Sequence, residues 1–146
     1  MSDEIVTRQL VVFSLGEEEY ALPIADVHEI IRYTEPRSVA SSVSWVRGVI
    51  SLRGKIVPVY DLASRLGCAG GEDVAERKIV IVEAAGQLAG VVVDDVAEVI
   101  TVDAEQLERL PSADEAAIDS IVKLDDRLIV LLSPAGLFGV GAEIAA

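Results

Sequence analysis

Hydrophobic and polar positions alternate most clearly between residues 46 and 67, where two runs rich in β-branched residues meet at one turn. Val49 to Leu52 leads into Arg53-Gly54 and Lys55 to Tyr60 leads out, so the pattern predicts a β-hairpin whose glycine permits the reversal. Pro58 cannot donate a backbone hydrogen bond, and we therefore expect the second strand at a sheet edge or at a bulge. That edge is a candidate docking place.

A short capped helix is expected directly after this hairpin. Asp61 occupies the N-cap position, and Gly67 lies where a glycine would end the helix. Ser133 and Pro134 begin a similar segment, with a serine cap and a proline at the first helical position. The two helix signals belong to a larger repeat.

The hydrophobic pattern of the first half recurs in the second half. Residues 10–31, LVVFSLGEEEYALPIADVHEII, align without a gap with residues 79–100, IVIVEAAGQLAGVVVDDVAEVI, 69 positions further on. The hairpin at 49–60 aligns with residues 121–132, which turn at Asp125-Asp126, 72 positions further on. Each copy therefore contains about five strands, although DVHEII would also suit one helical turn.

The repeat predicts an all-β fold with short helices. Short strands with glycine turns and no long helix favour small closed barrels, because closure removes exposed strand edges. We expect one domain of 146 residues built from two five-stranded β-barrel subdomains that pack side by side. The Gly-rich stretch 69–73 divides the chain, and it places the subdomains at about 9–68 and 76–140, with an exchange of terminal segments allowed.

Composition and net charge narrow the range of partners and cellular locations that we expect. Hydrophobic residues make up 51% of the chain but aromatic residues only 4%, so the core must consist of Val, Ile, Leu and Ala, which is material typical of strands. A formal net charge of −13 argues against nucleic-acid partners and anionic lipid surfaces. No apolar run approaches the roughly 20 residues that cross a bilayer, and the N-terminus does not resemble a signal peptide. We expect a soluble, cytoplasmic protein.

The sequence contains no recognisable catalytic or metal-binding constellation. His28 is the single histidine and has no cysteine or second histidine beside it, so it is a poor metal ligand or general base. Asp94 and Asp95 are neighbours in a strand and should point to opposite faces. The single cysteine, Cys68, can form no disulfide within the chain. We expect no catalytic residue, no metal and no cofactor.

Three charged residues lie in apolar surroundings. Glu29 and Glu98 occupy equivalent positions of the two copies, and Arg53 occupies the turn of the first hairpin. Each of them could simply lie on the solvated side of its strand or turn. Together they favour a docking surface, because an arginine at a rigid turn offers a fixed fork for carboxylates and charged rims around Val/Ile surfaces select partners.

Four stretches match a known family in the right order: the residue 10–31 segment, VRGVISLRGKIVPVYDLASRLG, VVVDDVAEVI and KLDDRLIVLL. They cover most of residues 9 to 132, and VRGVISLRGKIVPVYDL is the most specific of them. The sequence therefore resembles the CheW-like family of chemotaxis adaptors, to which the regulatory domain of the histidine kinase CheA is related.

The resemblance implies two SH3-like barrels with a shared apolar core and a bridging role without catalysis. One surface would hold the regulatory domain of a CheA-type kinase, which has the same fold, and a groove between the barrels would take the cytoplasmic tip of a chemoreceptor. The protein would lie at receptor arrays on the inner face of the membrane without inserting into it, and self-association in the array is allowed for. By motif position, the resemblance gives Val27, Glu29, Ile30, Gly48, Arg53, Val93 and Val96 as partner-binding residues. Glu98, the equivalent of Glu29 in the second copy, completes the expected set.

The sequence departs from the family pattern at several positions. The loop 39–43 lacks the usual prolines, Ser51 stands where asparagine is commonest, and SPAGLFG replaces an acidic helix-forming ending. One alternative is therefore an adaptor of a twitching or other non-flagellar chemosensory system. A second is a regulatory barrel that binds a small ligand between its two halves.

Overall fold

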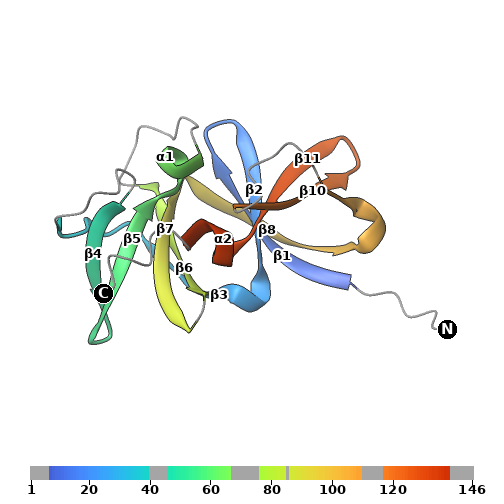
Figure 1. The fold of residues 1–146 in the computed structure, drawn as a ribbon. Helices are drawn as coiled ribbons and strands as arrows, with labels where there is room; N and C mark the ends of the chain where they lie inside the picture. Colours follow the sequence, from blue (N-terminus) through green and yellow to red (C-terminus); the bar gives the residue numbers. More distant parts are fainter. Residues whose placement is uncertain (1–6, 40–45, 67–75, 85, 110–116, 139–146) are drawn as a thin grey trace.

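The computed structural model describes residues 7–39, 46–66, 76–84, 86–109 and 117–138. Figure 1 shows two sheets side by side, with β4 and β5 at one end of the molecule and β10 and β11 at the other. The all-β class with few short helices is as predicted. The described strands are β1 (Thr7–Leu15), β2 (Glu18–Pro23), β3 (Val27–Arg32), β4 (Val46–Leu52), β5 (Lys55–Asp61), β6 (Lys78–Ala84), β7 (Gln87–Val93), β8 (Asp95–Asp103), β9 (Leu107–Glu108), β10 (Ile118–Leu124) and β11 (Arg127–Leu132). The described helices are η1 (Ile24–Asp26), α1 (Leu62–Leu66), η3 (Ala104–Gln106) and α2 (Pro134–Phe138).

The two sheets have equivalent strand orders. Sheet A has the order β8-β1-β2-β11-β10-β9, and sheet B has the order β3-β6-β7-β5-β4. The sequence offsets make β1 and β2 equivalent to β6 and β7, and β3, β4 and β5 equivalent to β8, β10 and β11. The bridge of Arg37 to Val49 at the edge of sheet B takes the place that β9 has in sheet A.

The two copies exchange their first hairpins. The β1-β2 hairpin lies in sheet A among strands of the second copy, and the β6-β7 hairpin lies in sheet B among strands of the first copy. Neither of the segments 9–68 and 76–140 therefore builds one sheet on its own. The repeat could not reveal this, because β3 and β8 carry the same sequence pattern and either could pair with β1.

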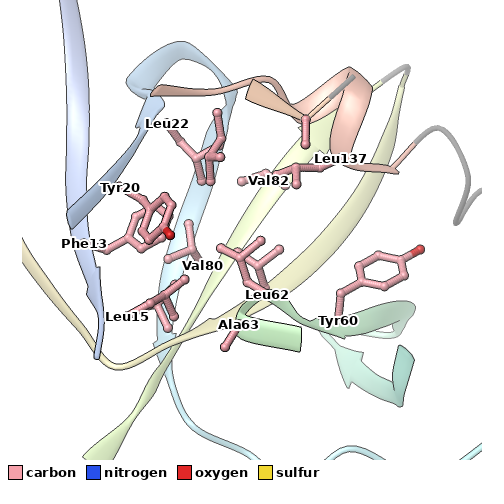
Figure 2. Packing of buried hydrophobic residues seen from close by; sticks show 14 of the residues in the cluster. Phe13, Leu15, Tyr20, Leu22, Tyr60, Leu62, Ala63, Val80, Val82 and Leu137 are labelled. Carbon is pink, nitrogen blue, oxygen red and sulfur yellow. The ribbon is translucent and has the colours of Figure 1, made fainter. Parts of the chain in front are cut away.

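The exchanged hairpins are buried on both faces. Leu10 and Val12 of β1 pack inside sheet A, whereas Phe13 and Leu15 pack into a core that both sheets share. In β6, the alternate residues divide in the same way between the interior of sheet B and the shared core. Figure 2 shows side chains from β1, β2, β6, α1 and α2 pointing into this shared core. Burial on two faces explains why these strands are continuous hydrophobic runs.

Local predictions agree well with the described elements. The hairpins turn at Arg53-Gly54 and Asp125-Asp126, and DVHEII forms a strand with an alternating burial pattern. Asp61 Oδ1 accepts a hydrogen bond from the Ser64 N–H (3.3 Å), so it caps the first turn of α1. The predicted helix-ending Gly67 and the boundary at 69–73 lie outside the described residues.

The second strand of the β4-β5 hairpin was expected at a sheet edge or at a bulge: the edge is wrong, and the register shift of the hairpin lies in β4, between Val46 and Gly48, rather than at Pro58. Strand β5 lies between β4 and β7, and Pro58 pairs in register with Val49 of β4. The parallel pairing with β7 begins only at Val59. At Pro58, β5 is therefore paired with β4 but not yet with β7, so the missing N–H leaves no hydrogen bond to β7 unmade.

Candidate functional site

A bidentate ion pair joins the first and last strands in the order of sheet B. Arg53 lies in the β4-β5 turn and donates hydrogen bonds from Nη1 and Nη2 to the carboxylate of Glu29 on β3, the second with a length of 2.9 Å. Strands β3 and β4 are the two ends of the strand order, so this contact requires the sheet to curl round on itself. The two residues that the sequence singled out separately are therefore partners of each other.

In sheet A, a network of three charged residues makes the equivalent connection. Arg127, the first residue of β11, donates from Nη2 to Glu98 on β8 (2.7 Å) and from Nε and Nη2 to Glu19 on β2 (3.1 and 2.9 Å). Strands β1 and β2 separate β8 from β11 in the strand order, so this contact also requires curling. Glu98 occupies the same place as Glu29, but its arginine comes from the position of Lys55 rather than from that of Arg53.

Arg53 of the first pair has an unusual backbone conformation. Its φ of +51° lies in the left-handed region, which a residue with a Cβ adopts only at an energetic cost. The Arg53 side chain nevertheless remains 71% exposed, while the Glu29 side chain is 20% exposed. The arginine is thus held at a position that favours glycine, with its charge presented to solvent.

The hydrogen bonds from Arg53 lower the pKa of the Glu29 carboxyl, and the Arg53 charge adds to this effect against the opposing effect of burial. The same pair raises the pKa of Arg53. A depressed carboxyl pKa contributes stability that is present above the ordinary carboxyl range and is lost as the pH falls through the lowered value.

We expect the substitution Arg53→Ala to raise the pKa of Glu29 towards its ordinary value, because the dominant hydrogen bonds disappear. The melting temperature should change little, since the Arg53 side chain is 71% exposed and ion pairs with an exposed partner add little stability. A carbon-detected NMR titration of Glu29 and a thermal melt measure the two effects. Lys55→Ala, which removes an exposed neighbouring cation, should leave the Glu29 titration unchanged. An unshifted Glu29 in Arg53→Ala would refute the pairing.

Two exposed apolar side chains occupy equivalent places on the outer faces of the two hairpins. Ile56 on β5 and Leu128 on β11 are both 68% exposed, the largest values among the exposed large hydrophobic residues described. Ile56 lies opposite Ser51, with Val49 and Pro58 on the same face. Sequence reasoning missed both residues, although Val57 and Val59 point inwards and strand alternation would have turned Ile56 outwards.

The hairpin face around Leu128 is hollowed into a trough of about 560 Å³. Ile121, Leu128 and Val130 supply its apolar floor, because they alternate on one face of β10 and β11. The polar lining residues are Glu17, Glu18, Glu19, Glu108 and Lys123. Lys123 is paired with Glu108 at 2.8 Å, which lowers the pKa of that carboxyl, so the rim is acidic overall.

The charges around the two hairpin faces are opposite in sign. Arg53 and Lys55 lie at the tip of the Ile56 hairpin, whereas Asp125 and Asp126 form the tip of the Leu128 hairpin beside the acidic trough. The duplication has therefore produced two faces with the same apolar centre and contrasting rims. Such rims determine which partner a face accepts.

Three of the other expected partner-binding residues remain accessible. Ile30 on β3 is 40% exposed, and Val27 on the same strand is half-buried against the shared core. Val96 on β8 is also half-buried against that core. Val27 and Ile30 therefore lie on the end strand of sheet B, and Val96 lies on the end strand of sheet A.

Gly48 and Val93 are placed differently from the expectation. Val93 is fully buried in the shared core, so a partner cannot contact its side chain; the VVV run of β7 is buried on both faces. Gly48 is buried and has a φ of +145°, and a Cβ there would lie 2.1 Å from the carbonyl oxygen of Arg37. Gly48 therefore allows the close approach of the segment at Arg37, which exchanges two hydrogen bonds with Val49 (2.8 and 2.9 Å).

The described residues contain no group of three His, Cys, Asp or Glu side chains placed to hold a metal ion. His28 lies exposed on β3. In the same part of the chain, no helix is long and apolar enough to cross a membrane.

Two curled sheets joined by a shared core, with an apolar hairpin face on each, define a double-barrel protein-binding module. The chain belongs to the CheW-like domain family, whose model matches residues 9–141. It is 30% identical over 135 residues to a probable chemotaxis protein CheW of Rhizobium etli. The aligned region covers 90% of this chain and 87% of that protein.

Among solved structures, the chain is similar to the scaffolding protein TtCheW of Thermoanaerobacter tengcongensis, with a TM-score of 0.84 and 38% identity over 94% of this chain and 92% of the other. A shorter similarity relates it to protein PilI of Pseudomonas aeruginosa, with 32% identity over 87 residues, covering 58% of this chain and 47% of that protein.

Proposed function

We propose that this protein is a non-catalytic chemotaxis adaptor that couples chemoreceptors to a CheA-type histidine kinase. Family membership over residues 9–141 is the observation that carries the proposal. The similarity to proteins named chemotaxis protein CheW and to a protein described as a scaffolding protein supports it. The adaptor would work in the cytoplasm, at receptor arrays on the inner face of the membrane.

The two hairpin faces provide the adaptor with two separate docking surfaces. An adaptor must bind more than one protein at once. Ile56 lies on β5 and Leu128 on β11, which belong to different sheets, and Figure 1 shows the β4-β5 and β10-β11 hairpins at opposite ends of the molecule. Their apolar centres and charged rims have the composition of protein interfaces. The regulatory domain of the kinase, which has the same fold in this family, would dock on one of them.

The opposite charges of the two rims also allow head-to-tail association between similar domains. The basic tip at Arg53 and Lys55 complements the acidic trough beside Leu128, so the faces of two like molecules would attract each other. Contacts of this heterologous kind form rings when the rotation closes. Self-association within the array is therefore part of the proposal.

The chemoreceptor tip would bind along the edge strands β3 and β8. Ile30 and Val99 occupy equivalent positions of these strands and are 40% and 52% exposed. An amphipathic helix docks its apolar face onto surfaces of this kind. Val27, Val96 and the Glu29–Arg53 pair would border the contact.

The test is a binding assay with the purified kinase regulatory domain and with receptor cytoplasmic fragments. We expect Ile56→Asp and Leu128→Asp each to weaken one protein contact at least tenfold, because a charge then enters an apolar interface centre, a loss of about 1.4 kcal/mol or more. Melting temperatures should stay close to that of the parent, since both side chains are 68% exposed.

Ile24→Asp is the matched control, because it makes the same change at a 38% exposed residue that lies on neither hairpin. Absence of any binding by the parent protein at high micromolar concentration would refute the adaptor function. Equal weakening by Ile24→Asp would refute the two hairpin faces but not the adaptor function.

A second candidate is an adaptor of a non-flagellar chemosensory system, and the shorter similarity to protein PilI is the observation that favours it. Capture of the protein from the native cell by the kinase of one system or of the other distinguishes the two candidates.

A further inference from the structure

The chain passes directly from sheet B to sheet A at Asp94. Strand β7 of sheet B ends at Val93, and strand β8 of sheet A begins at Asp95. Asp94 is therefore a single residue between the two barrels, at one end of the seam that holds the shared core. Its side chain is only 18% exposed.

Asp94 makes contacts with both sheets. Its backbone N–H donates to the carbonyl oxygen of Ser14 on β1 (2.9 Å), and its Oδ2 accepts from the N–H of Gly16 in the β1-β2 turn (2.6 Å), so it holds sheet A. Its Oδ1 lies 3.4 Å from Nε of Arg77, the residue before β6 of sheet B. The Arg77 carbonyl oxygen accepts in turn from the N–H of Tyr33, which follows β3 (3.1 Å).

The Arg77 side chain depends on this carboxylate. It is only 13% exposed, and its Nε has no hydrogen-bond partner within the described residues. A mostly buried guanidinium without a counter-charge is strongly unfavourable. The Asp94 carboxylate therefore compensates a charge of sheet B while it accepts a hydrogen bond from sheet A.

The first copy of the repeat shows that the fold does not require this arrangement. At the other crossing, from β2 to β3, the position equivalent to Asp94 is Ala25 within η1, which has no carboxylate. Arg8, the equivalent of Arg77, pairs instead with Asp119 of its own sheet at 3.5 Å. An ionic contact thus connects the sheets at the crossing that contains Asp94. At the β2-to-β3 crossing, no ionic contact links the equivalent residues, Ala25 and Arg8.

We propose that Asp94 is a positioning residue that fixes the angle between the two barrels. The proposal rests on the proposed adaptor function, because this angle sets the relative direction of the Ile56 and Leu128 faces on which partners would dock. The shared core holds the barrels together, and the Asp94 contacts select one orientation among those that apolar packing permits, since hydrophobic contact is not directional.

The test measures the distance between the two hairpin tips in the free protein. Spin labels are attached at Lys55→Cys and Asp126→Cys in a Cys68→Ser background, and pulsed electron resonance gives the distance distribution. Asp94→Ala should broaden or shift the distribution, and Asp94→Asn should do so less, because its amide oxygen can still accept from Gly16. Asp95→Ala is the matched control. It removes the adjacent carboxylate, which also reaches across to sheet B, at 3.7 Å from Lys78, but is 69% exposed, so its loss should leave the distribution unchanged.

If Asp94→Ala lacks a cooperative thermal melt, the double variant Asp94→Asn/Arg77→Gln replaces it, because it removes both charges and leaves no buried guanidinium. An unchanged distribution in a folded Asp94 variant, or an equal change in Asp95→Ala, would overturn the proposal. No partner protein is present in this measurement, so its outcome is independent of whether the adaptor function is correct.

Discussion

Fragments 1–70 and 71–146 should each remain unfolded alone and should fold together when they are mixed. Within the first fragment, hydrogen bonds join β1 to β2 and β4 to β5. The other neighbours of β1, β2 and β5 lie in the second fragment, and so does β6, the partner of β3 among the described strands. Isolated two-stranded hairpins are marginally stable at best in water. Phe13 and Val80 also belong to the same shared core, so each fragment alone would expose apolar surface.

Circular dichroism and NMR spectra of one labelled fragment, recorded with and without its partner, measure this result. We expect no cooperative melt for either fragment, and a single cooperative melt for the equimolar mixture. The control is the intact chain with a protease site between residues 70 and 71, cleaved after folding, which should retain its melting curve when undiluted. A native-like cooperative melt of either fragment alone would show that a contiguous half is an independent subdomain.

Replacing Gly48 with alanine should destabilise the protein by about 3 kcal/mol or more, because the new Cβ has no room and the backbone conformation is nearly restricted to glycine. The Cβ would lie 2.1 Å from the Arg37 carbonyl oxygen, and Gly48 has a φ of +145°. Relief requires the segment at Arg37 to move away from β4, which breaks its two hydrogen bonds with Val49. Chemical denaturation measures the loss of free energy.

Gly54→Ala is the matched control, since Gly54 also has a positive φ, of +84°, but nothing lies within 4 Å of a Cβ there. We expect it to cost clearly less, because only the turn conformation is strained. If Gly48→Ala weakened partner binding without loss of stability, Gly48 would act through contact with a partner, as the resemblance implied, and not through the packing of Arg37.

The elements of the fold could be predicted from the sequence, because their signals are local. The two hairpin turns and the Asp61 cap depend on residues a few positions apart. The exchange of hairpins could not be predicted, because it depends on which of two similar strands pairs with β1. Burial on both faces has the same origin, and it removes Val93, which the resemblance placed among the contact residues, from the surface.

The candidate site was predicted in part. Glu29, Glu98 and Arg53 stood out as charges in apolar surroundings, but a pairing between residues 24 positions apart depends on how far the sheet curls. Arg127 was missed because the position equivalent to Arg53 is Asp125, so the duplicated pattern pointed to the wrong residue. The acidic trough joins the β1-β2 hairpin of the first copy to strands β9, β10 and β11 of the second copy, and no single stretch of sequence contains it.

The exchange of hairpins also has a consequence for synthesis on the ribosome. Strand β2 needs β11 beside it, and β11 ends at Leu132, so sheet A remains incomplete until residue 132 has emerged. At roughly 5–20 residues per second, the nascent first half then waits several seconds with its apolar strands uncovered. Chaperones that hold nascent chains should therefore associate with this protein more persistently than with a protein of two consecutive barrels.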